Sequence, residues 1–145
     1  MPAWLEVLRS DHRRLEEALE GLARLDTGGA PGFGEALAVA RAAALEHYCR
    51  EEPFLAAIRA HSPEVAAKLA SQHAEALETA AEALRSLNDG QERDAAALAR
   101  RFGAIGQHNI IEEERDVFPL AERWLAGEEG EKLSAALAPD YHQDL

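Results

Sequence analysis

The sequence predicts an all-α fold, an up-down-up-down four-helix bundle with a short extra helix at the C-terminal end. Its composition is 47% hydrophobic but only 6% aromatic, which is more typical of helices than of sheets. Apolar residues recur every three or four positions in four long stretches, as they do on one face of a helix. Helix start and stop signals separate these stretches, and long helices with short connections pack antiparallel to their neighbours.

The first half of the chain predicts two helices. One apolar stripe covers Leu5–Leu22 and ends before the glycine-rich loop at residues 26–32. A second stripe covers Leu37–Ile58 and contains Pro53. Because proline lacks a backbone N–H and clashes with the preceding turn, we expect this helix to kink or break just past Glu51.

The second half predicts two long helices and one short one. Ser62 is a capping residue, followed by a proline in the first turn and then an acid near the positive end of the helix. The third helix then extends to the Asn-Asp-Gly turn at residues 88–90. Apolar residues at 98–125 mark the fourth helix, and a short fifth helix is expected over residues 128–138, before a polar tail.

Length and charge limit the organisation and the partners. We expect one domain over residues 1–145, with the bundle at about 3–126 and the short helix and tail at 127–145. The formal net charge is -12 and no basic patch is present, which argues against nucleic acid and anionic membranes as partners. The sequence shows no signal peptide, no apolar run of ~18 residues and a single cysteine. We therefore expect a soluble, cytoplasmic protein.

Four histidines and two glutamates form two copies of one spacing, offset by 61 residues. The first copy consists of His12, His47 and Glu51, and the second of His73, His108 and Glu112. Each predicted hairpin carries one histidine on its first helix and a His-x3-Glu pair on one face of its second. Buried imidazoles without partners are costly, so histidines on all four apolar stripes predict a metal site. Imidazole and carboxylate ligands suit iron, manganese or zinc.

Two residues are candidates for the last carboxylate ligand. The repeat selects Glu112, but the apolar residues that follow it are about one position late for a regular helix. One extra residue, as in a π-bulge, would restore the phase and turn Glu113 inward. We favour Glu113 and keep Glu112 as the alternative. The predicted metal ligands are therefore His12, His47, Glu51, His73, His108 and Glu113 or Glu112.

Several short motifs carry a family resemblance that extends from the first helix to about Trp124. They are Asp11-His12, the segment 47–52 (His-Tyr-Cys-Arg-Glu-Glu), Gln72-His73, the segment 108–114 (His-Asn-Ile-Ile-Glu-Glu-Glu) and Val117-Phe118-Pro119. In these residues the chain resembles the hemerythrin-like (HHE cation-binding) domain family. The resemblance implies a four-helix bundle that holds two iron ions, oxo- or hydroxo-bridged, with zinc or manganese suiting the same ligands.

The resemblance also implies a class of function. Family members bind oxygen, sense iron or oxygen, or respond to nitric oxide, peroxide or damaged iron–sulfur clusters. Oxygen-carrying hemerythrins place a second histidine one turn after the one on the third helix, where this chain has Leu77. We therefore expect a more open di-iron site than that of a reversible carrier.

Three functions follow as hypotheses. The first is binding of oxygen or another small gas or oxidant. The alternatives are a di-iron redox enzyme acting on peroxide, oxygen or nitric oxide, and an iron-handling stress protein; whether the protein is an enzyme stays open. The expected partner is a small gas or oxidant, and the expected assembly is a monomer or homodimer.

Overall fold

The computed structural model describes residues 1–25 and 29–138, and helices make up nearly all of this part of the chain. In order, the helices are α1 (Ala3–Ala23), α2 (Phe33–Arg50), α3 (Glu52–Arg59), α4 (Pro63–Asn88), α5 (Glu92–Glu112), the π-helix η1 (Glu113–Val117), α6 (Phe118–Trp124) and α7 (Glu128–Leu137). The polar tail predicted after residue 138 and part of the predicted loop at 26–32 lie outside the described residues.

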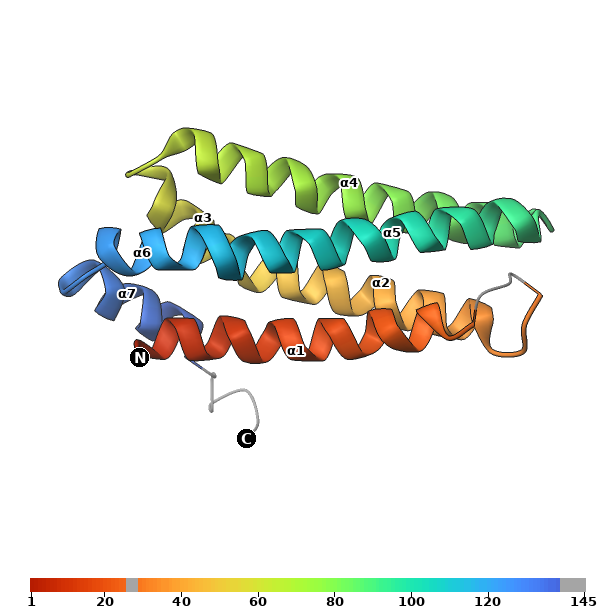
Figure 1. Cartoon of the computed structure of the whole chain (residues 1–145), viewed down its shortest axis with the longest axis horizontal. Helices are drawn as coiled ribbons and strands as arrows, with labels where there is room; N and C mark the ends of the chain where they lie inside the picture. Colours follow the sequence, from red (N-terminus) through yellow and green to blue (C-terminus); the bar gives the residue numbers. More distant parts are fainter. Residues whose placement is uncertain (26–28, 139–145) are drawn as a thin grey trace.

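The helices form a four-helix bundle with antiparallel neighbours, as predicted. Figure 1 shows α1, α2, α4 and α5 as the four long helices, with α2 continued by α3 and α5 by η1 and α6. The predicted short C-terminal helix is α7, which packs against α1 and α3 at the end of the bundle where the N-terminus lies. Within the described part of the chain, we find no helix with the length and apolar character needed to cross a membrane.

Local signals in the sequence determine where the helices begin and break. α2 ends at Arg50, and α3 begins at Glu52 with Pro53 in its first turn, so the predicted break past Glu51 is confirmed. The Ser62 hydroxyl accepts a hydrogen bond from the backbone N–H of Val65 at 3.3 Å, which confirms the predicted cap of α4.

The extra residue predicted in the fourth long helix takes the form of a π-turn. η1 joins α5 to α6 without interrupting the helical rod. A π-turn holds more residues per turn than an α-helix, so it shifts the helix phase. Glu113, Val117 and Phe118 consequently all face the interior.

The core consists of two apolar clusters at successive levels along the bundle. The first apolar cluster lies towards the end where α1 connects to α2, and includes Leu15, Leu19, Leu37, Ala80 and Phe102. The second apolar cluster lies towards α7, and includes Trp4, Leu8, Phe54, Leu69 and Phe118. A layer of buried polar side chains separates the two clusters on every long helix.

Candidate metal centre

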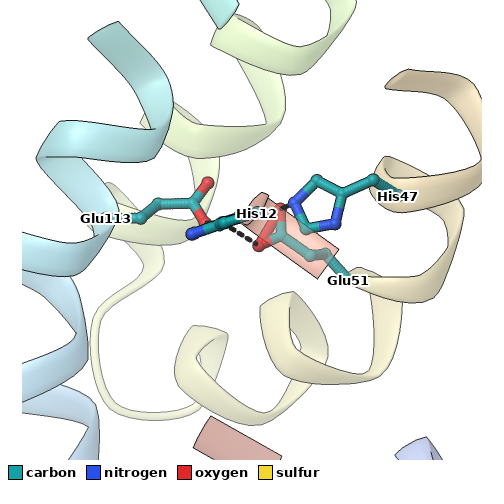
Figure 2. Close-up of side chains that lie close together, drawn as sticks. All are labelled: His12, His47, Glu51 and Glu113. Carbon is teal, nitrogen blue, oxygen red and sulfur yellow. Dashed lines mark hydrogen bonds and ion pairs between the residues drawn. The ribbon is translucent and has the colours of Figure 1, made fainter. Parts of the chain in front are cut away.

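Five predicted ligands meet in this polar layer, and we call them the five-residue cluster. They are His12 from α1, His47 from α2, Glu51 from the α2–α3 junction, His73 from α4 and Glu113 from η1. None is more than 5% exposed. Figure 2 shows four of them, all except His73, with their polar ends pointing toward one another.

The two carboxylates lie at the middle of the five-residue cluster. Glu51 Oε1 is 3.2 Å from the Nε2 atoms of both His47 and His73, and Glu51 Oε2 is 3.8 Å from Nε2 of His12. Glu113 Oε1 is 3.2 Å from Nε2 of His12, and Glu113 Oε2 is 3.1 Å from Nε2 of His73. All three histidines therefore point the same ring nitrogen, Nε2, toward the carboxylates.

The helix geometry explains how these groups reach one place. His47 and Glu51 are four residues apart, so they share a face of α2 although the helix ends between them. Glu113 follows the buried Asn109 by one turn and begins the π-turn. Each ligand-type residue occupies a position at which its helix would otherwise present an apolar side chain to the core.

Several polar atoms of the five-residue cluster have no hydrogen-bond partner. Both oxygens of Glu51 and both ring nitrogens of His47 are buried without one. Buried polar groups are normally satisfied, and leaving them unpaired costs free energy. One ligand atom from each of His12, His47, Glu51 and Glu113 lies within 4.8 Å of the others. Imidazole and carboxylate donors at this spacing fit a transition-metal ion, which would satisfy these atoms.

The carboxylates hold protons on the histidines when no metal is bound. Burial lowers the pKa of His12, but hydrogen bonds with Glu113 and Glu114 outweigh it and raise that pKa to about 11. For His73, burial is likewise outweighed by Glu113 and Glu51, which raise the pKa to about 9. Metal ions bind deprotonated imidazole, so metal binding at neutral pH must displace these protons.

The two glutamates differ in their protonation. Burial raises the pKa of Glu51, but its contacts with Glu113 and the three histidines hold that pKa well below its usual range. Burial and the negative charge of Glu51 raise the pKa of Glu113. The two carboxylates oppose each other's ionisation, and the contacts with three histidines favour the charged form of Glu51 more than that of Glu113.

The structure does not bring His108 or Glu112 into the cluster. The side chain of His108 is 71% exposed, and its Nε2 lies 3.3 Å from Glu112 Oε2 at the bundle surface. Glu112 also pairs with Lys68 and accepts a hydrogen bond from Gln72 Nε2 at 2.9 Å. α5 is a regular helix up to Glu112, so the fully buried Asn109 occupies the core position and His108 points away.

The cluster is surrounded by further residues, which the repeated ligand spacing did not identify. Tyr48 stacks on His73 with ring centroids 4.0 Å apart, and Phe118 stacks on His12 at 5.4 Å. Asp11 Oδ2 lies 3.8 Å from Nδ1 of His47, and Arg14 and Arg50 pair with its other oxygen. Tyr48, Phe118 and Asp11 carry no spacing signal, because they follow from how the helices pack.

The chain matches one family of known proteins. The Hemerythrin HHE cation binding domain family matches residues 4–121, which reach from α1 into α6 and include the whole five-residue cluster. No curated protein and no solved structure matches the chain significantly. Because the match covers most of the chain, the protein belongs to the hemerythrin HHE cation-binding domain family.

Proposed function

We propose that this protein is a non-heme di-iron protein that binds oxygen or another small gas or oxidant at the five-residue cluster. The observation that carries the proposal is the position of the two buried carboxylates between the histidines. Each oxygen of Glu113 contacts a different histidine, His12 on one side and His73 on the other. This is the arrangement expected of a carboxylate that bridges two metal ions.

Glu51 supports the same assignment. Its two oxygens also point to different histidines, Oε2 to His12 and Oε1 to both His47 and His73. Glu51, Glu113 and the three imidazoles would hold the metal, and a set of two carboxylates and three nitrogens would leave room for other ligands. Iron bound there would supply redox chemistry and those open positions to a small molecule. The aromatic rings of Phe118 and Tyr48 stack on His12 and His73.

A redox enzyme acting on peroxide, oxygen or nitric oxide is the second candidate. The observation that favours it is the small number of nitrogen ligands, because three histidines reach the cluster and His108 stays at the surface. Leu77, one turn after His73, packs against the first apolar cluster and offers no further nitrogen. Fewer nitrogen ligands leave more open positions, which suits turnover better than reversible carriage.

Metal content and an optical spectrum test the proposal. The protein is loaded with ferrous iron without air, analysed for metal, and then exposed to oxygen. Two irons per chain and a stable, oxygen-dependent visible band are the expected result for binding. A band that decays while peroxide or nitric oxide is consumed would favour the enzyme. The His47→Ala variant is the control, since it removes one ligand from the cluster, and wild-type protein that retains no iron contradicts both functions.

A further inference from the structure

Two consecutive glutamates contact the two ring nitrogens of His12. Glu113 Oε1 lies 3.2 Å from Nε2, on the side of the five-residue cluster, and Glu114 Oε2 lies 2.6 Å from Nδ1, on the opposite side of the ring. Both glutamates belong to η1. The π-turn that brings Glu113 inward therefore also places Glu114 against His12.

Glu114 is itself held in place. Arg13, the residue after His12, pairs with the same Glu114 oxygen and also with Glu16 Oε1 at 3.0 Å. The side chain of Glu114 is 23% exposed, whereas that of His12 is fully buried. Glu114 thus lies at the edge of the bundle and reaches inward to the far side of the imidazole.

We propose that Glu114 is a positioning residue of the metal centre, which accepts a hydrogen bond from the Nδ1–H of His12 and so directs Nε2 to the metal. This inference rests on the proposed metal binding. An imidazole that binds a metal through one nitrogen usually donates its other N–H to a carboxylate or carbonyl, and that bond fixes both the tautomer and the ring orientation.

Packing alone cannot select this orientation. Phe118 stacks on His12 with the two rings 9° from parallel. Rotating the imidazole by 180° about its Cβ–Cγ bond leaves the ring in the same plane, so the stacking contact is the same for both orientations. The contacts with Glu114 and Glu113 distinguish them, because the rotated ring would present carbon atoms where Nδ1 and Nε2 now lie; of the two, Glu114 is the partner outside the five-residue cluster.

Zinc, a diamagnetic stand-in for iron, allows a test on the full chain. The affinity for Zn²⁺ is measured by competition with a chelator, and the His12 tautomer by long-range ¹⁵N–¹H spectra of the zinc-loaded protein. We expect Glu114→Ala to bind Zn²⁺ about 10–100-fold more weakly and to lose the single Nδ1–H tautomer of His12. Glu114→Gln should recover much of both, since its amide oxygen still accepts the bond.

Glu16→Ala is the matched control, because Glu16 pairs with Arg13 but does not contact His12. Its Zn²⁺ affinity should stay within about twofold of wild type. The proposal is overturned if Glu114→Ala keeps the wild-type affinity and tautomer, or if Glu16→Ala weakens binding equally. Wild-type protein that binds neither zinc nor iron would overturn the proposed function as well, whereas the first two outcomes leave it standing.

Discussion

The two His-x3-Glu pairs have the same spacing and almost the same internal geometry, yet both residues of the first pair face the core, whereas the histidine of the second pair lies at the surface. Nε2 is 3.2 Å from the carboxylate in the His47–Glu51 pair and 3.3 Å in the His108–Glu112 pair. The side chains are 3% and 0% exposed in the first pair but 71% and 11% in the second. Spacing along a helix thus determines which residues contact one another, but not whether that face points to the core.

The rotation of each helix about its own axis makes the difference. In α2, Leu37, Ala40 and Ala44 continue in phase to His47. In α5, Phe102, Gly106 and Asn109 define the buried face, and the next inward position one turn later is Glu113. The second half of the chain therefore contributes its carboxylate from Glu113, one residue beyond the repeat. Its second histidine, His108, contributes no nitrogen to the cluster.

The largest expected effect comes from neutralising the buried carboxylate. Glu51→Gln keeps the side-chain shape but removes the charge that the five-residue cluster offers a metal, so we expect the affinity to fall by more than about 100-fold. The matched variant Glu112→Gln, in the surface pair, should stay near wild type. Metal content after dialysis measures both. Equal losses in the two variants would mean that both pairs bind metal and that the comparison fails.

The histidines give the next largest effect. His47→Ala should lower metal affinity by at least about tenfold, because it removes an inward-facing imidazole. His108→Ala should change it by less than about twofold, since that side chain is exposed and pairs with Glu112 outside the five-residue cluster. Chelator competition with Fe²⁺ or Zn²⁺ would measure both. A strong loss in His108→Ala would show that α5 rotates or unwinds when metal binds.

The protonated histidines predict a pH dependence for the metal-free protein. The pKa values of His73 and His12 are raised to about 9 and about 11, above the ordinary value of about 6.5 in an unfolded chain. The stability they contribute is complete below pH ~6.5 and is lost as pH rises through the folded values. Urea unfolding at pH 7 and pH 10 should show the free energy of unfolding decreasing.

The variant His73→Gln serves as the reference for this titration. It should lose the part of the pH dependence near pH 9, while the part from His12 remains. Metal-loaded protein should lack both parts, because the metal has replaced the protons. A free energy of unfolding that stays flat from pH 7 to pH 10 in the metal-free protein would contradict the prediction.

The smallest expected effect concerns the start of the second half. Ser62→Ala removes the hydroxyl that accepts from Val65 N–H, and losing such a cap costs about 1 kcal/mol. Thermal unfolding of metal-free protein should detect this decrease. Metal affinity should not change, since the Ser62 hydroxyl bonds to the backbone of Val65 and not to a residue of the five-residue cluster. A change in affinity as large as the one in His47→Ala would instead mean that the two halves are coupled through α4.

Most of the fold could be predicted because its signals are local. Apolar periodicity and caps define the helices, and Pro53 breaks the second helix where backbone chemistry requires it. Even the π-turn left a trace, as a one-residue phase error in the apolar pattern. The repeat gave His108 as a ligand, whereas the structure buries its neighbour Asn109 and leaves the His108 side chain 71% exposed. A repeated spacing between ligand-type residues does not give the rotation of the helix that decides which of two neighbours faces the core.

The outer partners of the site could not be predicted in the same way. Glu114 and Asp11 are two acids among 27 in the chain, and neither has a spacing that distinguishes it from solvent-exposed acids. Their contacts with His12 and His47 depend on how α1 packs against η1 and α2. Such contacts between helices are set by the rotation and tilt of both partners, which no single stretch of sequence records.

The polar layer between the two apolar clusters has a consequence for cooperativity. α1 and α4 each pass from one apolar cluster, through the layer, into the other, and so do α2 with its continuation α3 and α5 with its continuation η1 and α6. Without metal, the polar layer between the two clusters contributes little free energy from apolar burial to the stability of the bundle. We expect amide hydrogen exchange in metal-free protein to show two separately opening segments on each helix, and metal to merge them into one. A bound ion would then unite the halves of the bundle into a single folding unit.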